Sequence, residues 1–256
     1  MPYHIPNRKY NLIEGLSVFL RHLGINADYH SLIPTLNLVS SDLEFADNIF
    51  REYQINPQNT ICLCPRGSDW GANKIYLYFD EIIEYIANKY NYNVLVLGAE
   101  KDFLYATDSL KNCRAKYINL CGQTTILQAA AIISKSKLVL GVDTGLLHIA
   151  CAVNTPNIAL MTCYHFGIFF PYSKYTSAIY LPTVCMNCDN KCKYNEAICL
   201  QRIRPSTVKY VIDYTLNNEL NRTRAFIEPA SVNVAPAEYK SIDNSIFSEY
   251  VEVINM

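Results

Sequence analysis

The chain has 256 residues, half of them apolar, and its charged side chains nearly cancel to a formal net charge of -1. This length and composition predict a globular protein with a core of its own. No run of Lys and Arg is present that would follow a phosphate backbone, so we expect no nucleic-acid partner. The apolar stretches are shorter than the roughly 20 residues of a membrane span, and no signal-peptide pattern is seen, so a cytoplasmic location is expected.

The first 55 residues contain two helical patterns, at about 9–24 and from Ser41 to about Tyr53. Ser41-Asp-Leu-Glu44 has the spacing of a capping box, in which two side chains satisfy the free amides of a helix start. The segment is too short for a second α/β domain. We therefore interpret 1–55 as the remnant of a preceding domain with linker helices.

From about Thr60 onward, short β-type runs alternate with longer helical patterns, which is typical of parallel strands joined by crossover helices. We therefore predict an α/β fold, a Rossmann-like parallel sheet flanked by helices, in residues 56–217. The expected strands are 61–64, 93–97, 117–120, 137–142, 157–161 and 178–181, and the expected helices are 75–90, 102–112, 125–135, 146–153 and 205–217. After that the periodicity disappears, so 218–256 is expected to be a loosely packed or disordered tail.

Two loops follow strands at the edge where an open parallel sheet binds its ligands. Ser68 and Lys74 follow the first strand, and a hydroxyl with a cation suits a diphosphate; a solvated loop is the alternative. Glu100 follows the second strand, where a carboxylate can accept hydrogen bonds from a ribose. Here the alternative is an exposed acidic residue at a helix start.

A third turn, Asp143-Thr144-Gly145, leads from an apolar strand directly into a helix. Amides at such a helix start favour an anion, and His148, four residues after Thr144, lies on the same helix face. The alternative is a capped helix with a buried, hydrogen-bonded histidine.

Taken in order, five motifs of this sequence resemble those of glycosyltransferase family 9. They are Pro-x-Gly-Ser-x-Trp with Lys74, Gly-x-Glu, Ile-Asn-Leu-x-Gly-x-Thr, Asp-Thr-Gly-x-x-His-x-Ala and Asn-Thr-Pro. The matching segment, from about Ile61 to Val208, is similar to the C-terminal, donor-binding domain of the ADP-heptose:lipopolysaccharide heptosyltransferases. That domain is the C-terminal half of a GT-B glycosyltransferase, which has two Rossmann-like domains.

The resemblance implies sugar transfer from a nucleotide-diphosphate donor, expected to be ADP-heptose, to a glycan or protein acceptor at the inner face of the membrane. It implies phosphate contacts by Ser68 and Lys74, an adenosine contact by Glu100, contacts to the diphosphate and sugar by Asp143, Thr144 and Gly145, and support of the loop by His148. No metal is expected for the transfer, because Lys74 and the amides after Asp143 would stabilise charge on the leaving diphosphate.

Family members also carry an N-terminal domain that binds the acceptor and supplies an acidic general base. Here only Tyr10–Ile25 is similar to the end of that domain, so the base has no candidate, and a separate chain is one possible source of the acceptor domain. The alternative function is a non-catalytic nucleotide-sugar- or metal-binding module. A dinucleotide-dependent oxidoreductase is disfavoured, because no Gly-x-Gly-x-x-Gly follows a strand.

Ten cysteines form two groups. Six stand singly in apolar surroundings and are expected to be buried thiols, namely Cys62, Cys64, Cys113, Cys121, Cys151 and Cys163. The other four, Cys185, Cys188, Cys192 and Cys199, have the spacing of a knuckle that holds Zn or Fe. Four sulfur ligands leave no open position, so the metal would be structural; reduced thiols under a loop are the alternative.

Overall fold

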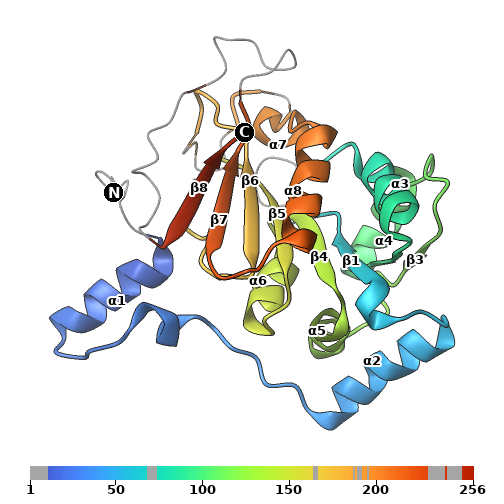
Figure 1. The fold of residues 1–256 in the computed structure, drawn as a ribbon, viewed down its shortest axis with the longest axis horizontal. Coiled ribbons are helices and arrows are strands. Elements are labelled where there is room, and N and C mark those ends of the chain that lie inside the picture. The colour runs from blue at the N-terminus through green and yellow to red at the C-terminus, as the bar shows by residue number, and fades with distance from the viewer. Residues whose placement is uncertain are drawn as a thin grey trace.

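The computed structural model describes residues 11–67, 74–163, 167–186, 188, 192–194, 196–229, 240 and 250–256. Within them, eight strands form one parallel sheet in the order β3-β2-β1-β4-β5-β6-β7-β8 (Figure 1). The strands are β1 (Thr60–Cys64), β2 (Asn93–Val96), β3 (Tyr117–Asn119), β4 (Leu138–Val142), β5 (Asn157–Met161), β6 (Thr176–Tyr180), β7 (Thr223–Ile227) and β8 (Val251–Asn255). The predicted α/β fold is confirmed.

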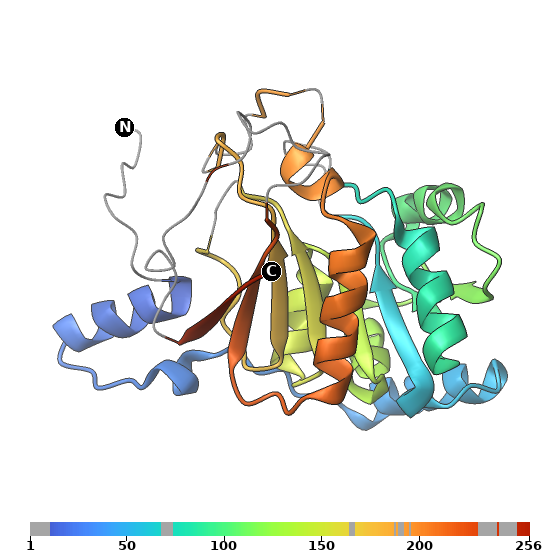
Figure 2. The same ribbon diagram turned by 45° about the horizontal axis from the view of Figure 1, so that its top comes forward.

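Helices cover both faces of this sheet (Figure 2). The helices are α1 (Leu12–His22), α2 (Ser40–Glu52), α3 (Phe79–Tyr90), α4 (Phe103–Ser109), α5 (Ile126–Lys135), α6 (Gly145–Ala152), α7 (Ile198–Gln201) and α8 (Pro205–Asn217), with 3-10 turns η1 (Tyr29–Leu32), η2 (Pro57–Asn59) and η3 (Glu100–Asp102). Helices α3, α4 and α8 pack on one face, while α2, α5 and α6 pack on the other.

Strand β1 shows how the sequence builds a core on both faces. Successive side chains of a strand point to opposite sides. Ile61 and Leu63 therefore pack with α3 and α8, whereas Cys62 and Cys64 pack on the α5 and α6 side. Burial raises the pKa of the Cys64 thiol, so this side chain is an apolar filler rather than a nucleophile.

The six cysteines expected in the core are described, and five of them are buried as predicted. Cys113 differs, because it is half-buried beside β3 and its Sγ donates to the Ala115 carbonyl at 3.6 Å.

The expectation of a loose tail after Asn218 is wrong for two of its segments. β7 pairs in parallel with β6, and β8 pairs with β7, so both extend the sheet. Every residue of β7 is buried. Arg224 and Glu252 interrupt the apolar pattern of the two strands, so pairing decides their conformation, that of β7 with β6 and that of β8 with β7.

Two helix starts also differ from expectation. Helix α2 begins at Ser40, and its N-cap Val39 makes no side-chain capping bond, so the capping box expected from Ser41 is wrong. Helix α3 begins at Phe79 rather than at Ile75, because Ile75 forms an antiparallel β-bridge with Arg66.

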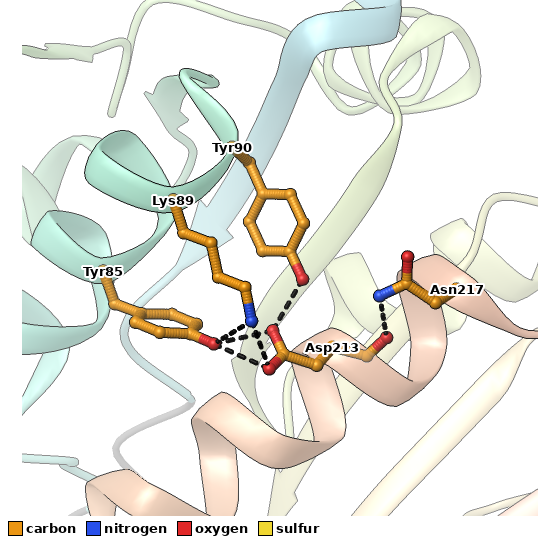
Figure 3. Close-up of polar contacts among 5 residues, drawn as sticks. All are labelled: Tyr85, Lys89, Tyr90, Asp213 and Asn217. Carbon is orange, nitrogen blue, oxygen red and sulfur yellow. Dashed lines mark hydrogen bonds and ion pairs between the residues drawn. The ribbon is translucent and has the colours of Figure 1, made fainter.

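Helices α3 and α8 are joined by the Asp213 carboxylate (Figure 3). It accepts hydrogen bonds from Tyr85 Oη at 2.7 Å, from Tyr90 Oη at 2.6 Å and from Lys89 Nζ at 2.6 Å. Asn217 Nδ2 donates to the Asp213 carbonyl at 2.7 Å, one turn along α8. Partial burial raises the pKa of Asp213, but the bonds from α3 outweigh this, and the net pKa lies below its ordinary value of 3.8.

Asp213→Asn is expected to lower the melting temperature at neutral pH by about 2 °C, a small effect because the carboxylate is partly exposed. The lowered folded-state pKa means that the carboxylate stabilises the fold above its unfolded pKa and loses this effect as pH falls through the folded value. The melting temperatures of protein and variant should therefore converge as pH falls below the folded-state pKa of Asp213.

The matched control is Asp108→Asn, since Asp108 forms an exposed ion pair with Lys111 three residues away. This control should leave the melting temperature unchanged. Equal melting of protein and Asp213→Asn at neutral pH would contradict the role of the carboxylate.

Candidate functional site

A cavity of about 470 Å³ lies at the carboxyl ends of β1, β2 and β4, against the first residues of α5 and α6. Its wall includes Arg66, Gly98, Lys101, Thr125, Thr144 and Gly145. This is the edge at which open parallel sheets bind ligands, and helix starts there present free N–H groups and a positive dipole end to an anion. We call it the carboxyl-edge cavity.

The two helix starts in this wall differ in their caps. At α5, Thr125 Oγ1 accepts from the Gln128 amide at 3.2 Å, and Gln128 Oε1 accepts from the Thr125 amide at 2.9 Å, which confirms the predicted capping box. At α6, the N-cap Thr144 has extended backbone and makes no capping bond with its side chain. The start of α6 therefore presents amides without a side-chain cap to the cavity.

Lys74 and Asp143 form an ion pair beside the cavity. Lys74 Nζ donates to Asp143 Oδ2 at 2.7 Å and to the Asp143 carbonyl at 3.3 Å. The two side chains are only 6% and 13% exposed. Gly67 allows this approach, because a Cβ there would lie 2.7 Å from Lys74 Cδ and 2.8 Å from the Asp143 carbonyl. The pair joins the loop after β1 to the end of β4.

His148 lies one turn into α6, behind the cavity. Its Nδ1 is 2.9 Å from Tyr172 Oη, and its ring meets Phe170 edge-on at 5.0 Å between centroids. Burial lowers the pKa of His148, while Asp143 acts in the opposite direction and Lys74 adds to the lowering. The imidazole is therefore neutral at neutral pH, and its hydrogen bond to Tyr172 fixes the base of α6.

Of the predicted donor contacts, Thr144 and Gly145 line the cavity. Lys74, Asp143 and His148 lie next to each other behind it and are not among its lining residues, so the donor contacts of Lys74 and Asp143 stay predictions. Glu100 is the first residue of η3 and is exposed. Ala99 and Lys101 on either side of it line the cavity, but Glu100 does not. Its contact with an adenosine therefore stays a prediction, and Ser68 lies outside the described residues.

Arg66 is a cavity residue that the sequence analysis missed. Its guanidinium lies over the Tyr105 ring at 5.3 Å, and its Nε is 3.8 Å from Asp102 Oδ1. Asp102 Oδ2 in turn accepts from the Ala99 amide at 2.9 Å. These contacts hold a cation in the cavity wall. Its position directly before Gly67, within the Pro-x-Gly-Ser-x-Trp motif, is the sequence feature that could have indicated it.

The four cysteines of the predicted metal knuckle are described, but their sulfurs have different partners. Cys185 Sγ is 3.3 Å from Thr183 Oγ1, Cys192 Sγ donates to the Glu196 carbonyl at 3.3 Å, and Cys199 Sγ accepts from the Cys163 amide at 3.5 Å. Among the described residues, no three Cys, His, Asp or Glu side chains are grouped to hold a metal ion. Metal binding stays a prediction.

No helix in the described part of the chain has the length and apolar character needed to cross a membrane.

Comparison with known proteins links the chain to one family. The model of "Glycosyltransferase family 9 (heptosyltransferase)" matches residues 2–198. The lipopolysaccharide core heptosyltransferase OpsX of Haemophilus influenzae is 27% identical over 157 residues, which are 60% of this chain and 43% of that protein. Lipopolysaccharide heptosyltransferase 2 of Escherichia coli is 27% identical over 135 residues, which are 50% of this chain and 38% of that protein.

Solved structures agree on the fold. The ADP-heptose lps heptosyltransferase II of E. coli superposes with a TM-score of 0.58 at 23% identity, over 75% of this chain and 58% of that one. A glycosyl transferase family 9 protein of Veillonella parvula superposes with a TM-score of 0.69 at 13% identity, over 82% of this chain and 62% of that one. The chain spans less than half the length of the curated relatives above.

Proposed function

We propose, because this chain belongs to glycosyltransferase family 9 (heptosyltransferase), that its carboxyl-edge cavity binds a nucleotide-sugar donor. The donor would be ADP-heptose, and the sugar would pass to a glycan acceptor such as a lipopolysaccharide core, or to a protein. The names of the related heptosyltransferases support this choice. The reaction would take place at the cytoplasmic face of the membrane.

The observation that carries this proposal is the meeting of two helix starts and a fixed guanidinium in one cavity. A diphosphate held there would accept hydrogen bonds from the amides of α6 and an ion pair from Arg66. Negative charge grows on the leaving diphosphate during glycosyl transfer, and the same groups would stabilise it. The Lys74–Asp143 ion pair would hold the loop after β1, which carries Arg66, next to the start of α6, so that Arg66 and the α6 amides could contact the same diphosphate.

The complete reaction also needs an acceptor site and a general base. We propose that a further domain, or a separate chain, provides both. A row of exposed apolar side chains on α1 and its C-cap residue supports this, namely Leu12, Leu16, Phe19 and Leu23. Their spacing places them along one side of the helix, and an exposed apolar surface of this kind indicates a protein interface.

Gly145→Leu tests the donor site without disturbing the fold, since a Cβ at Gly145 meets no atom within 4 Å. The leucine would enter the cavity, and we expect calorimetry to show ADP-heptose affinity falling at least about tenfold. Gly15→Leu is the matched control, because Gly15 is also helical and has no atom within 4 Å of its Cβ. GDP-mannose and UDP-glucose should bind more weakly than ADP-heptose to the unmodified protein.

Absence of ADP-heptose binding by the folded protein would overturn the donor assignment, as would equal affinity in Gly145→Leu and Gly15→Leu. Donor binding together with no transfer, even with a complete acceptor domain present, would favour the alternative of a non-catalytic nucleotide-sugar-binding module.

We further propose that Cys185, Cys188, Cys192 and Cys199 hold one structural Zn or Fe, which their spacing supports. Protein purified without chelators should contain about one metal ion per chain by elemental analysis. Cys185→Ser/Cys188→Ser should lose it, whereas Cys113→Ser, half-buried beside β3, should retain it. Equal metal content in both variants would contradict the proposal.

A further inference from the structure

We propose that the protein has a second binding site, for a phosphorylated monosaccharide, at the opposite edge of the sheet. A cavity of about 620 Å³ lies at the amino ends of β6, β7 and β8, against η1. We call it the amino-edge cavity. Among the described residues it shares no lining residue with the carboxyl-edge cavity, so the two are separate sites.

One wall of the amino-edge cavity is aromatic and firmly held. Tyr250, which is 37% exposed, stacks on the buried Tyr29 with 4.1 Å between ring centroids and 8° between ring planes. Tyr29 Oη donates to the Tyr172 carbonyl at 3.0 Å and accepts from Asn11 Nδ2 at 3.0 Å. A fixed tyrosine ring offers a flat apolar surface for the C–H face of a sugar at little entropic cost.

Lys174 and Arg222 give this wall its positive charge. They line the cavity together with His30, and no carboxylate does within the described part of the chain. Lys174 Nζ lies over the Tyr175 ring at 5.2 Å. Neither Lys174 nor Arg222 has an ion-pair partner among the described residues. An ammonium and a guanidinium on one concave wall attract a phosphate monoester.

Neutral polar groups complete the wall. Asn154, which has a left-handed backbone (φ 60°), and Asn221 both line the cavity. Asn221 Oδ1 accepts from Arg224 Nη2 at 3.2 Å, which fixes the orientation of its amide. Amides suit sugar hydroxyls, which inorganic phosphate lacks. A nucleobase has no slot between Tyr29 and Tyr250, because those rings already stack on each other.

The test measures calorimetric binding of three probes, mannose 6-phosphate, glucose 1-phosphate and ribose 5-phosphate, with mannose and inorganic phosphate as comparisons. At least one sugar phosphate should bind at least about tenfold more tightly than either comparison. Lys174→Ala/Arg222→Ala should weaken it about tenfold or more, and Tyr250→Ala should weaken it while Tyr250→Phe retains it. Circular dichroism verifies that each variant is folded.

The control is Arg114→Ala/Lys116→Ala, which removes two exposed cations beside β3, at the other end of the strand order. This variant should bind the sugar phosphate as the unmodified protein does, and so should Gly145→Leu. The proposal is overturned if no sugar phosphate binds at about 10 mM, if inorganic phosphate binds equally well, or if Gly145→Leu abolishes binding. The last result would place the ligand in the carboxyl-edge cavity.

Discussion

Lys74→Met is expected to lower the free energy of unfolding by about 3 kcal/mol. The Asp143 carboxylate is nearly buried, and the substitution removes the cation that pairs with it. The double variant Lys74→Met/Asp143→Asn should recover much of that loss, since an amide costs far less than an unpaired charge to bury. Urea unfolding of the two single variants and the double variant gives the coupling energy of the pair.

Lys135→Met is the matched control for this experiment. Lys135 Nζ lies 2.7 Å from Asp47 Oδ1, the same separation as in the Lys74–Asp143 pair, but these side chains are 27% and 50% exposed. The control should cost less than about 1 kcal/mol. A Lys74→Met loss no larger than the control would show that burial does not strengthen the pair.

Gly141→Ala is expected to destabilise the protein by about 3 kcal/mol. A Cβ at Gly141 would lie 2.4 Å from the Cys64 carbonyl oxygen and 2.8 Å from Cys64 Cβ. The backbone of Cys64 has little room to retreat, because β1 is hydrogen-bonded to β2 on one side and to β4 on the other. Glycine at such a place marks a close approach of two chain segments.

Gly15→Ala is the control, because Gly15 is exposed in α1 and a Cβ there meets no atom within 4 Å. It should stabilise the protein by about 0.5–1 kcal/mol through helix propensity. Urea unfolding measures both changes. A Gly141→Ala protein within about 1 kcal/mol of the parent would contradict the tight packing of β4 on β1.

The central strands and α8 could be predicted because their local signals agree with the final fold. Residues 158–161 form an apolar run and lie in β5, while Pro205 stands at the first position of α8, where its fixed φ suits a helix start. β7 and β8 could not be predicted, because Arg224 and Glu252 interrupt their apolar runs and pairing with strands far away in the sequence decides their conformation.

In the candidate site, too, some features could be predicted from the sequence and others could not. The motif around Asp143 correctly places Thr144 and Gly145 at a helix start in the wall of a cavity. The sequence does not show which way a side chain points after a turn. Arg66 was therefore not predicted, whereas the exposed position of Glu100 at the start of η3 matches the alternative stated for it from the sequence.

The outermost strands determine whether the edge of this sheet can pair with strands of other molecules. All residues of β6 and β7 are buried, so a protein shortened after α8 would expose an apolar strand with unpaired amides and carbonyls. Such an edge recruits strands from other molecules and leads to aggregation. β8 covers it and carries Glu252, whose carboxylate pairs with Arg224 at 3.2 Å. A charged last strand disfavours such pairing, although within the described residues β8 is not next to any of the strands β1, β2 and β4 that border the carboxyl-edge cavity.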